Sequence, residues 1–341
     1  MQNTSQRLIP GWVWALLAVA LVALTLVLFM TDRSPEPGAA LVYDVSEFEA
    51  VADDDIRYRE TGRIALALDT PTGLAAAEDN RLFVVGDDVL LVLDRSGREQ
   101  ARHVFGGRPH CVAVAPDHVV YIGMRDRVKV FSESDGLSAA WAPLDEQAWL
   151  TSIAADDRYV FVADAGNRRV LRYDRTGGVV NEIGGRTGPE NAPRFIVPSY
   201  YLDVLPDGMG ALWITNPGRL GIEKYRMDGE LLGAWHQPGM AVDKFAGCCN
   251  PIHAALKSDG SLVTAEKGLN RVKVFNADRS FAGVVAAPEM LNAGWSAADF
   301  PPDPAPIRDL AVDPDDRILV LHGPLRAVLV FEPLPEGEES P

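Results

Sequence analysis

The clearest pattern in the chain is an alternation of apolar and polar residues that repeats along most of its length. Residues 159–173, YVFVADAGNRRVLRY, form two such runs joined by a short polar corner. Alternation with a period of two predicts β-strands, and Gly166 with Asn167 supplies the turn between them. Strand–turn–strand units of this kind return about every forty to fifty residues, the period of propeller blades. The six units cover residues 71–94, 109–131, 151–174, 198–225, 251–275 and 306–331.

The units are expected to close into an all-β, six-bladed propeller. Residues 126–131 (DRVKVF) and 270–275 (NRVKVF) are nearly the same string, which favours a repeat over the alternative of a β-sandwich. A sheet of a few short strands buries little by itself, so such sheets stack around an axis. Residues 62–68, GRIALAL, stand where an outermost strand would fall, and the last unit ends at its third strand. The N-terminal strand is therefore predicted to complete the last blade.

The segment before the repeats predicts a membrane anchor. Residues 11–30 contain no charged residue and are long enough to cross the hydrocarbon layer as a helix. The alternative is a cleaved signal peptide, which has a shorter apolar core and a small-residue cleavage site. We predict a cytoplasmic tail at 1–10, a transmembrane helix at 11–31, a tether and wrapping segment at 32–61, the propeller at 62–333 and an acidic tail at 334–341. The weak charge bias places the propeller on the periplasmic or extracellular side of a plasma or inner membrane.

Charge and cysteine content narrow the function classes. The net charge is −16, and no basic stripe with interleaved aromatic residues occurs, so nucleic acid is disfavoured as a partner. Three cysteines are too few for a disulfide framework, and no CxxC pair suggests a zinc ribbon or haem attachment.

One string points to a known family. VADAGNRRV at 162–170 resembles the signature of NHL repeats, and the resemblance extends more loosely over residues 62–331. The resemblance implies a six-bladed propeller, here in a membrane-anchored, bacterial-type member. The NHL family includes scaffolds that bind protein or RNA and one enzyme branch, the metal-dependent peptidylglycine-amidating lyases. Because a fold does not carry an activity with it, the function has to be argued from a site.

The repeat locates the rim on which a site is expected. In a propeller, the starts of the inner strands and the ends of the second strands lie on one rim of the central channel. The inner-strand positions are Gly73, Cys111, Thr151, Tyr200 or Tyr201, His253 and Asp309, and the second-strand positions are Gly86, Met124, Asp164, Asn216, Glu266 and His322. Several of these residues are equally explained by turn chemistry.

The fifth unit differs most from the other repeats in the residue types at its strand ends. It reads GCCNPIH at 247–253 and TAEKG at 264–268. Cys248 and Cys249 are read in three ways: as a vicinal disulfide, as thiols that bind a soft metal together with His253, or as small residues without chemistry. The rim candidates are Cys248, Cys249, Asn250, His253, Glu266, Lys267, His110, Cys111, His322 and Arg308, and the candidate ligands for zinc, calcium or copper are His253, Cys111 and His322.

Two further features bear on partners. Cations recur between the second and third strands, where they could attract an anion or simply be solvated turn residues. They are Arg125, Arg169, Arg219, Lys267 and Arg326. The long connections 187–195 and 288–304 are candidates for a lid or a partner contact.

The sequence favours a binding module over an enzyme. It contains no Ser-His-Asp elbow, Walker loop, dinucleotide fingerprint or HExxH motif. We predict a membrane-tethered scaffold that binds a protein or small ligand at the rim, as an accessory subunit of a membrane complex. The alternatives are a metal-dependent lyase or hydrolase in the channel, and a redox protein that uses Cys248 and Cys249.

Overall fold

A computed structural model describes residues 10–31, 46–132, 136–185, 194–292 and 305–335. The chain divides into two units, Met1–Val45 and Ser46–Pro341, and each is described by itself. Of the predicted lid segments 187–195 and 288–304, residues 187–193 and 293–304 lie outside the described residues. So do the tail at 1–9, most of the tether, and the acidic tail from 336.

The first unit contains the helix α1, Gly11–Thr31. Its side chains are described from Trp12 to Thr25, and most of the large apolar ones among them, including Trp12 and Leu21, are exposed. When only the described residues are counted, no helix reaches the length and apolar character needed to cross a membrane.

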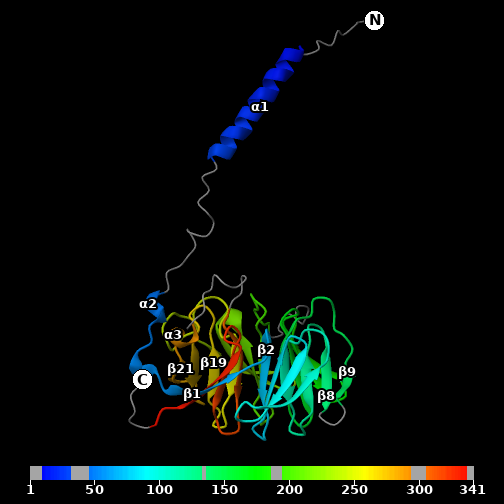
Figure 1. Cartoon of the computed structure of the whole chain (residues 1–341), viewed down its shortest axis with the longest axis vertical. Helices are drawn as coiled ribbons and strands as arrows, with labels where there is room; N and C mark the ends of the chain where they lie inside the picture. The colour runs from blue at the N-terminus through cyan, green and yellow to red at the C-terminus, as the bar shows by residue number, and fades with distance from the viewer. Residues whose placement is uncertain (1–9, 32–45, 133–135, 186–193, 293–304, 336–341) are drawn as a thin grey trace. The chain divides into compact units, whose positions relative to one another are not determined.

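The second unit consists of six four-stranded antiparallel sheets, one for each predicted repeat (Figure 1). Blade 1 is β2 (Pro71–Ala76), β3 (Leu82–Gly86), β4 (Val89–Leu93) and β5 (Glu99–Val104). Blade 2 is β6 (Cys111–Val114), β7 (Val120–Gly123), β8 (Val128–Ser132) and β9 (Gly136–Ala140). Blade 3 is β10 (Leu150–Ala155), β11 (Tyr159–Asp164), β12 (Arg169–Asp174) and β13 (Val179–Gly184).

The remaining blades follow in the same order. Blade 4 is β14 (Val204–Pro206), β15 (Ala211–Asn216), β16 (Gly221–Arg226) and β17 (Leu231–His236). Blade 5 is β18 (His253–Leu256), β19 (Leu262–Ala265), β20 (Val272–Phe275) and β21 (Phe281–Ala286). Blade 6 is β22 (Ile307–Val312), β23 (Ile318–His322), β24 (Ala327–Pro333) and β1 (Tyr58–Ala65). Short helices lie at α2 (Ser46–Glu49), η1 (Asp53–Asp55), η2 (Pro217–Arg219) and α3 (Pro288–Leu291).

The prediction of a six-bladed all-β propeller is confirmed, and so is its closure by the N-terminal strand. β1 pairs with β24 in antiparallel register, with Ile64 opposite Val328. β1 begins at Tyr58, four residues before the predicted start, and a bulge between Glu60 and Gly62 joins the extra residues to the ladder.

The hydrophobic core lies between neighbouring blades rather than within one. Ile64 and Val328 of blade 6, for example, belong to one buried cluster with Leu74 and Leu91 of blade 1. Each sheet therefore covers the apolar face of the next sheet. Because no sheet can bury its apolar faces alone, the six sheets are stable only when they close into a ring.

Candidate functional site

A ring of six equivalent residues lines the start of the inner strands. In blades 1, 3 and 6 the inner strand shows a register shift at this point, so two residues face one on the second strand. In every blade, one inner-strand residue lies opposite the residue that precedes the second-strand position predicted from the repeat. We call this set the channel ring: Gly73, Cys111, Ser152, Asp203, His253 and Asp309.

Side chains of the channel ring connect one blade to the next. Asp309 Oδ2 accepts a hydrogen bond from the Leu74 amide of blade 1 at 2.8 Å. Asp203 Oδ2 accepts one from the Ala254 amide of blade 5 at 2.9 Å. These bonds use polar groups at the channel that would otherwise be buried without partners, and they fix both carboxylates in place.

His253 and Asp203 form a pair within the ring. His253 Nδ1 lies 3.5 Å from Asp203 Oδ2, close enough for an ion pair but longer than a well-formed hydrogen bond. Burial alone would lower the pKa of His253, but the neighbouring carboxylates of Asp203 and Asp309 outweigh it and raise that pKa. Asp203 therefore favours a protonated imidazole and orients the ring.

The other titratable members of the ring respond to the same surroundings. Burial raises the pKa of the Asp309 carboxyl to about 7, helped by the charge of Asp203 and opposed by that of His253. Burial also raises the pKa of the Cys111 thiol well above its usual value, with Asp309 and Asp203 adding to the effect. Asp309 consequently changes its protonation state near neutral pH, His253 keeps its proton to a higher pH than a free imidazole does, and Cys111 is a thiol.

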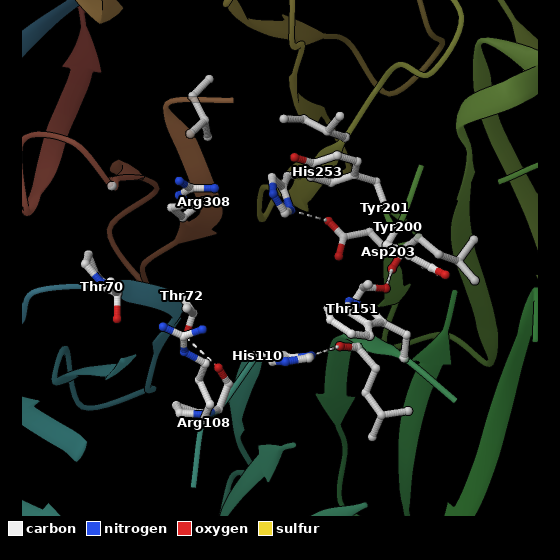
Figure 2. A pocket seen from close by; sticks show the side chains of 18 of the residues that line it. Thr70, Thr72, Arg108, His110, Thr151, Tyr200, Tyr201, Asp203, His253 and Arg308 are labelled. Atoms are coloured by element: carbon white, nitrogen blue, oxygen red, sulfur yellow. Dashed lines mark hydrogen bonds and ion pairs between the residues drawn. The ribbon is translucent and has the colours of Figure 1, made fainter. Parts of the chain in front are cut away.

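A cavity of about 710 Å³ opens above the ring and is lined by residues from all six blades (Figure 2). Its wall on the side of blades 3 and 4 is aromatic, because Trp149 and Tyr200 stack with ring centroids 5.1 Å apart. Arg108 and Arg308 lie on the side of blade 1, next to Thr70 and Thr72. The size is typical of a small-molecule site, and the lining combines flat apolar surface with a few charged groups.

Three predicted site residues line this cavity: His110, His253 and Arg308. His110 Nδ1 lies 3.0 Å from the Leu150 carbonyl oxygen, and its ring packs against Trp149. Burial lowers the pKa of His110. Cys111 belongs to the channel ring but does not line the cavity, because its sulfur occupies the space left by Gly123, the residue opposite it on β7.

Glu266 and its neighbours have structural roles in blade 5. The Glu266 carboxylate is fully buried and accepts hydrogen bonds or ion pairs from Arg271 Nε at 2.9 Å, Lys273 Nζ at 3.0 Å and the Ala246 amide at 2.9 Å. Asn250 is buried and exchanges hydrogen bonds with the backbone of Lys267. None of these side chains lines the cavity. Their hydrogen bonds to Ala246 and Lys267 instead hold the loop before β18 against blade 5.

His322 is likewise held inside the structure. Its Nε2 lies 2.8 Å from the Leu291 carbonyl oxygen, and its Nδ1 accepts the Leu325 amide at 3.1 Å. Both ring nitrogens are engaged, and burial lowers the pKa of His322. The structure therefore does not bring His322 together with His253 in one site.

Cys248 and Cys249 are free thiols whose sulfur atoms lie 3.0 Å apart. Cys248 is exposed, Cys249 is buried, and neither lines the cavity. Within the described ranges, no group of three or more His, Cys, Asp or Glu side chains is placed to hold a metal ion.

The recurring cations do not form a free ring. Arg169 pairs with Asp164 and two further carboxylates, and Arg326 with Asp69 at 2.8 Å. Among the five predicted cations, Arg326 is the one that lines the cavity.

Sequence reasoning missed Asp203, Trp149 and Arg108, and it placed Thr151 where the channel ring has Ser152. The sequence does contain a feature that identifies Asp203 as the equivalent of Asp309, namely its distance from the aspartate of the following turn. Asp309 precedes the turn residue Asp313 by four positions, and Asp203 precedes Asp207 by the same interval. The insertion that follows Asp207 hid this equivalence.

Comparison with known proteins supports the fold. No protein-family model and no curated protein matches the chain, so the resemblance to NHL repeats stays a prediction. Solved structures do match. A streptogramin B lyase shares 12% identity at a TM-score of 0.56, with 82% of this chain and 98% of that chain covered. A virginiamycin B lyase from Staphylococcus aureus shares 11% identity at a TM-score of 0.53, with 82% and 89% covered. A protein of unknown function from Bacteroides thetaiotaomicron shares 13% identity at a TM-score of 0.57, with 82% and 76% covered. At such identities the likeness establishes the propeller fold and nothing about activity.

Proposed function

We propose that this propeller binds a small molecule in the channel-mouth cavity and transfers a proton to or from it through His253. The observation that carries the proposal is the His253–Asp203 pair, in which a histidine that lines the cavity stands 3.5 Å from a buried, fixed carboxylate. General acid–base catalysis needs a proton carrier with a pKa near the working pH and a second group that orients it.

Asp309 supports the same chemistry. Its carboxyl is in the same ring, and burial brings its pKa to about 7. A carboxyl and an imidazole whose protonation states depend on each other can act as an acid and a base in one reaction. That two of the fold's neighbours are lyases agrees with a reaction of this class, although likeness of fold alone does not transfer it.

The second candidate is binding without chemistry, as a scaffold or accessory subunit. It is favoured by the exposed ring of Tyr200 at the cavity mouth, where 59% of the residue remains accessible to a partner. In both cases we propose a membrane tether and a propeller on the periplasmic or extracellular side. This part rests on the uncharged run at 11–30.

The test is to incubate the full-length protein with a metabolite extract from the source organism and to follow by mass spectrometry which compounds are consumed and formed. We expect a substrate–product pair that the wild-type protein converts and that His253→Gln does not. Asp203→Asn should reduce the rate and shift its pH optimum downward, because the carboxylate that raises the pKa of His253 is lost. Compounds that bind without being converted would instead favour the scaffold.

A further inference from the structure

Two arginines in the cavity form no ion pair with a described carboxylate, although Asp69 and Asp203 line the same cavity. Arg108 precedes β6 in blade 2, and Arg308 lies on β22 in blade 6, so they stand on either side of blade 1. Figure 2 shows both side chains on one side of the cavity, next to Thr70 and Thr72. Within the part of the chain that the structure describes, neither guanidinium forms a hydrogen bond or ion pair.

This arrangement is unusual for an acidic protein. The chain has 48 Asp and Glu residues for 32 Lys and Arg residues, so carboxylates are plentiful. Elsewhere these carboxylates form ion pairs with arginines: Arg169 contacts three of them, and Arg175 contacts Asp117 at 2.7 Å. A guanidinium presents several N–H donors in a planar fork that suits a carboxylate or phosphate. Two such forks left open in a concave site are therefore positioned for an anion that the protein itself does not supply.

The opposite wall defines the rest of the ligand. Trp149 and Tyr200 occupy equivalent positions in blades 3 and 4 and are stacked at an angle of 23° between their planes. Trp149 is half-buried and contacts both His110 and Tyr200, whereas Tyr200 is largely exposed, so the stack leaves the ring of Tyr200 as a flat apolar surface that the protein does not cover. A ligand that uses both walls must carry its negative charge at one end and a planar apolar body at the other.

We infer that the ligand of this cavity is a planar organic anion, held by Arg108 and Arg308 at its charged end and by Trp149 and Tyr200 at its flat end. The inference rests on the proposed function and adds the chemical class of the ligand. His253 lies between the two walls on blade 5, beside the part of the ligand that joins the charge to the ring.

Gly323 controls the position of Arg308. A Cβ atom at residue 323 would lie 2.6 Å from Arg308 Nε and 2.9 Å from its Cγ. An alanine at this position must therefore displace the Arg308 side chain, although the charge stays in the protein. Gly323→Ala thus tests whether the position of the guanidinium matters, in addition to its charge.

The experiment measures binding of 2-naphthoate and of its neutral counterpart 2-naphthamide to the full-length protein by titration calorimetry. We expect naphthoate to bind about tenfold more tightly, a difference that one charge-assisted hydrogen bond can supply. In Arg108→Gln/Arg308→Gln the affinity for naphthoate should fall to that for naphthamide, which should stay within about twofold of wild type. Gly323→Ala should weaken naphthoate several-fold and leave naphthamide unchanged.

Two further variants complete the design. Trp149→Leu should weaken both probes equally, because it removes the ring on which Tyr200 stacks and no charge. Arg98→Gln is the matched control, since Arg98 is an exposed arginine outside the cavity lining and should leave both affinities unchanged.

Three outcomes would overturn the inference: equal binding of the two probes to wild type, a preference for naphthoate that survives in the double variant, or no binding of naphthoate at millimolar concentration. Its failure is separable from failure of the proposed function. Equal binding would reject only the ligand class, whereas a His253→Gln protein that converts metabolites like wild type would reject only the proton-transfer role.

Discussion

Glu266 gives the sharpest stability prediction, because it is a buried carboxylate between two buried cations. Arg271 and Lys273 approach the same oxygen, Oε2, at 2.9 Å and 3.0 Å, and the three side chains are at most 1% exposed. Glu266→Gln keeps the shape but removes the negative charge and turns an amide group toward two donors. Removing one member of a buried ion pair usually costs about 3–5 kcal/mol, since the remaining charge is left without compensation.

Lys273 determines how this cost depends on pH. Burial lowers the pKa of Lys273 to about 8, although the charge of Glu266 opposes that effect. Without Glu266 the pKa of Lys273 falls further, so the lysine loses its proton more readily as pH rises. A neutral lysine no longer needs a counter-charge, and the destabilisation of Glu266→Gln should therefore be smaller at pH 9 than at pH 6.

The assay is equilibrium urea unfolding of the full-length protein, followed by circular dichroism, which yields the free energy of unfolding and its denaturant dependence. Glu60→Gln is the matched control, because Glu60 pairs with the exposed Arg63 on β1 and its loss should cost less than about 1 kcal/mol. A loss below about 1 kcal/mol in Glu266→Gln, or a loss that grows with pH, would refute the assignment of a structural ion-pair role to this carboxylate.

Three more predictions follow from single features. The pKa of Asp309 is about 7 in the folded protein and about 4 when unfolded, so the free energy of unfolding should fall by up to about 4 kcal/mol as pH rises from about 4 to 7. Asp309→Asn should flatten this pH profile, and identical profiles for wild type and variant would contradict the raised pKa. Ile64→Ala in the closing strand should cost about 2–4 kcal/mol in chemical unfolding, whereas Val104→Ala at a 69% exposed site should cost little, and equal effects would argue against a buried closure. Cys248 and Cys249 are thiols in the structure, so the intact mass of the native protein should not change on reduction; a gain of about 2 Da would reveal a disulfide instead.

The closure of the ring shows how much the sequence specified. Residues 62–68 alternate as a strand, the last repeat lacks its fourth strand, and β1 indeed pairs with β24. Such features are local or periodic, because the side-chain period of a strand and the turn chemistry of Gly166 and Asn167 act over a few residues. Repetition then made the global architecture readable, since each sheet had to cover the next.

The same reasoning from the repeat predicted only some of the residues that line the cavity. His110, His253 and Arg308 were found because the repeat places the starts of the inner strands on one rim. Glu266 and His322 were assigned to that rim by position. Whether a side chain at an equivalent position points into the channel or into the blade depends on packing against the neighbouring sheet.

The sequence by itself determined the strand periodicity, the number of blades and the strand that closes the ring, because these follow from short-range alternation and its repetition. Only the tertiary structure decided that Asp203 faces His253 and that Arg108 and Arg308 share one cavity without an ion pair to a described carboxylate. Those residues are 50 and 200 positions apart in the chain. They meet because six sheets converge on one axis, and the distances, burial and pKa values of a site exist only once that convergence has occurred.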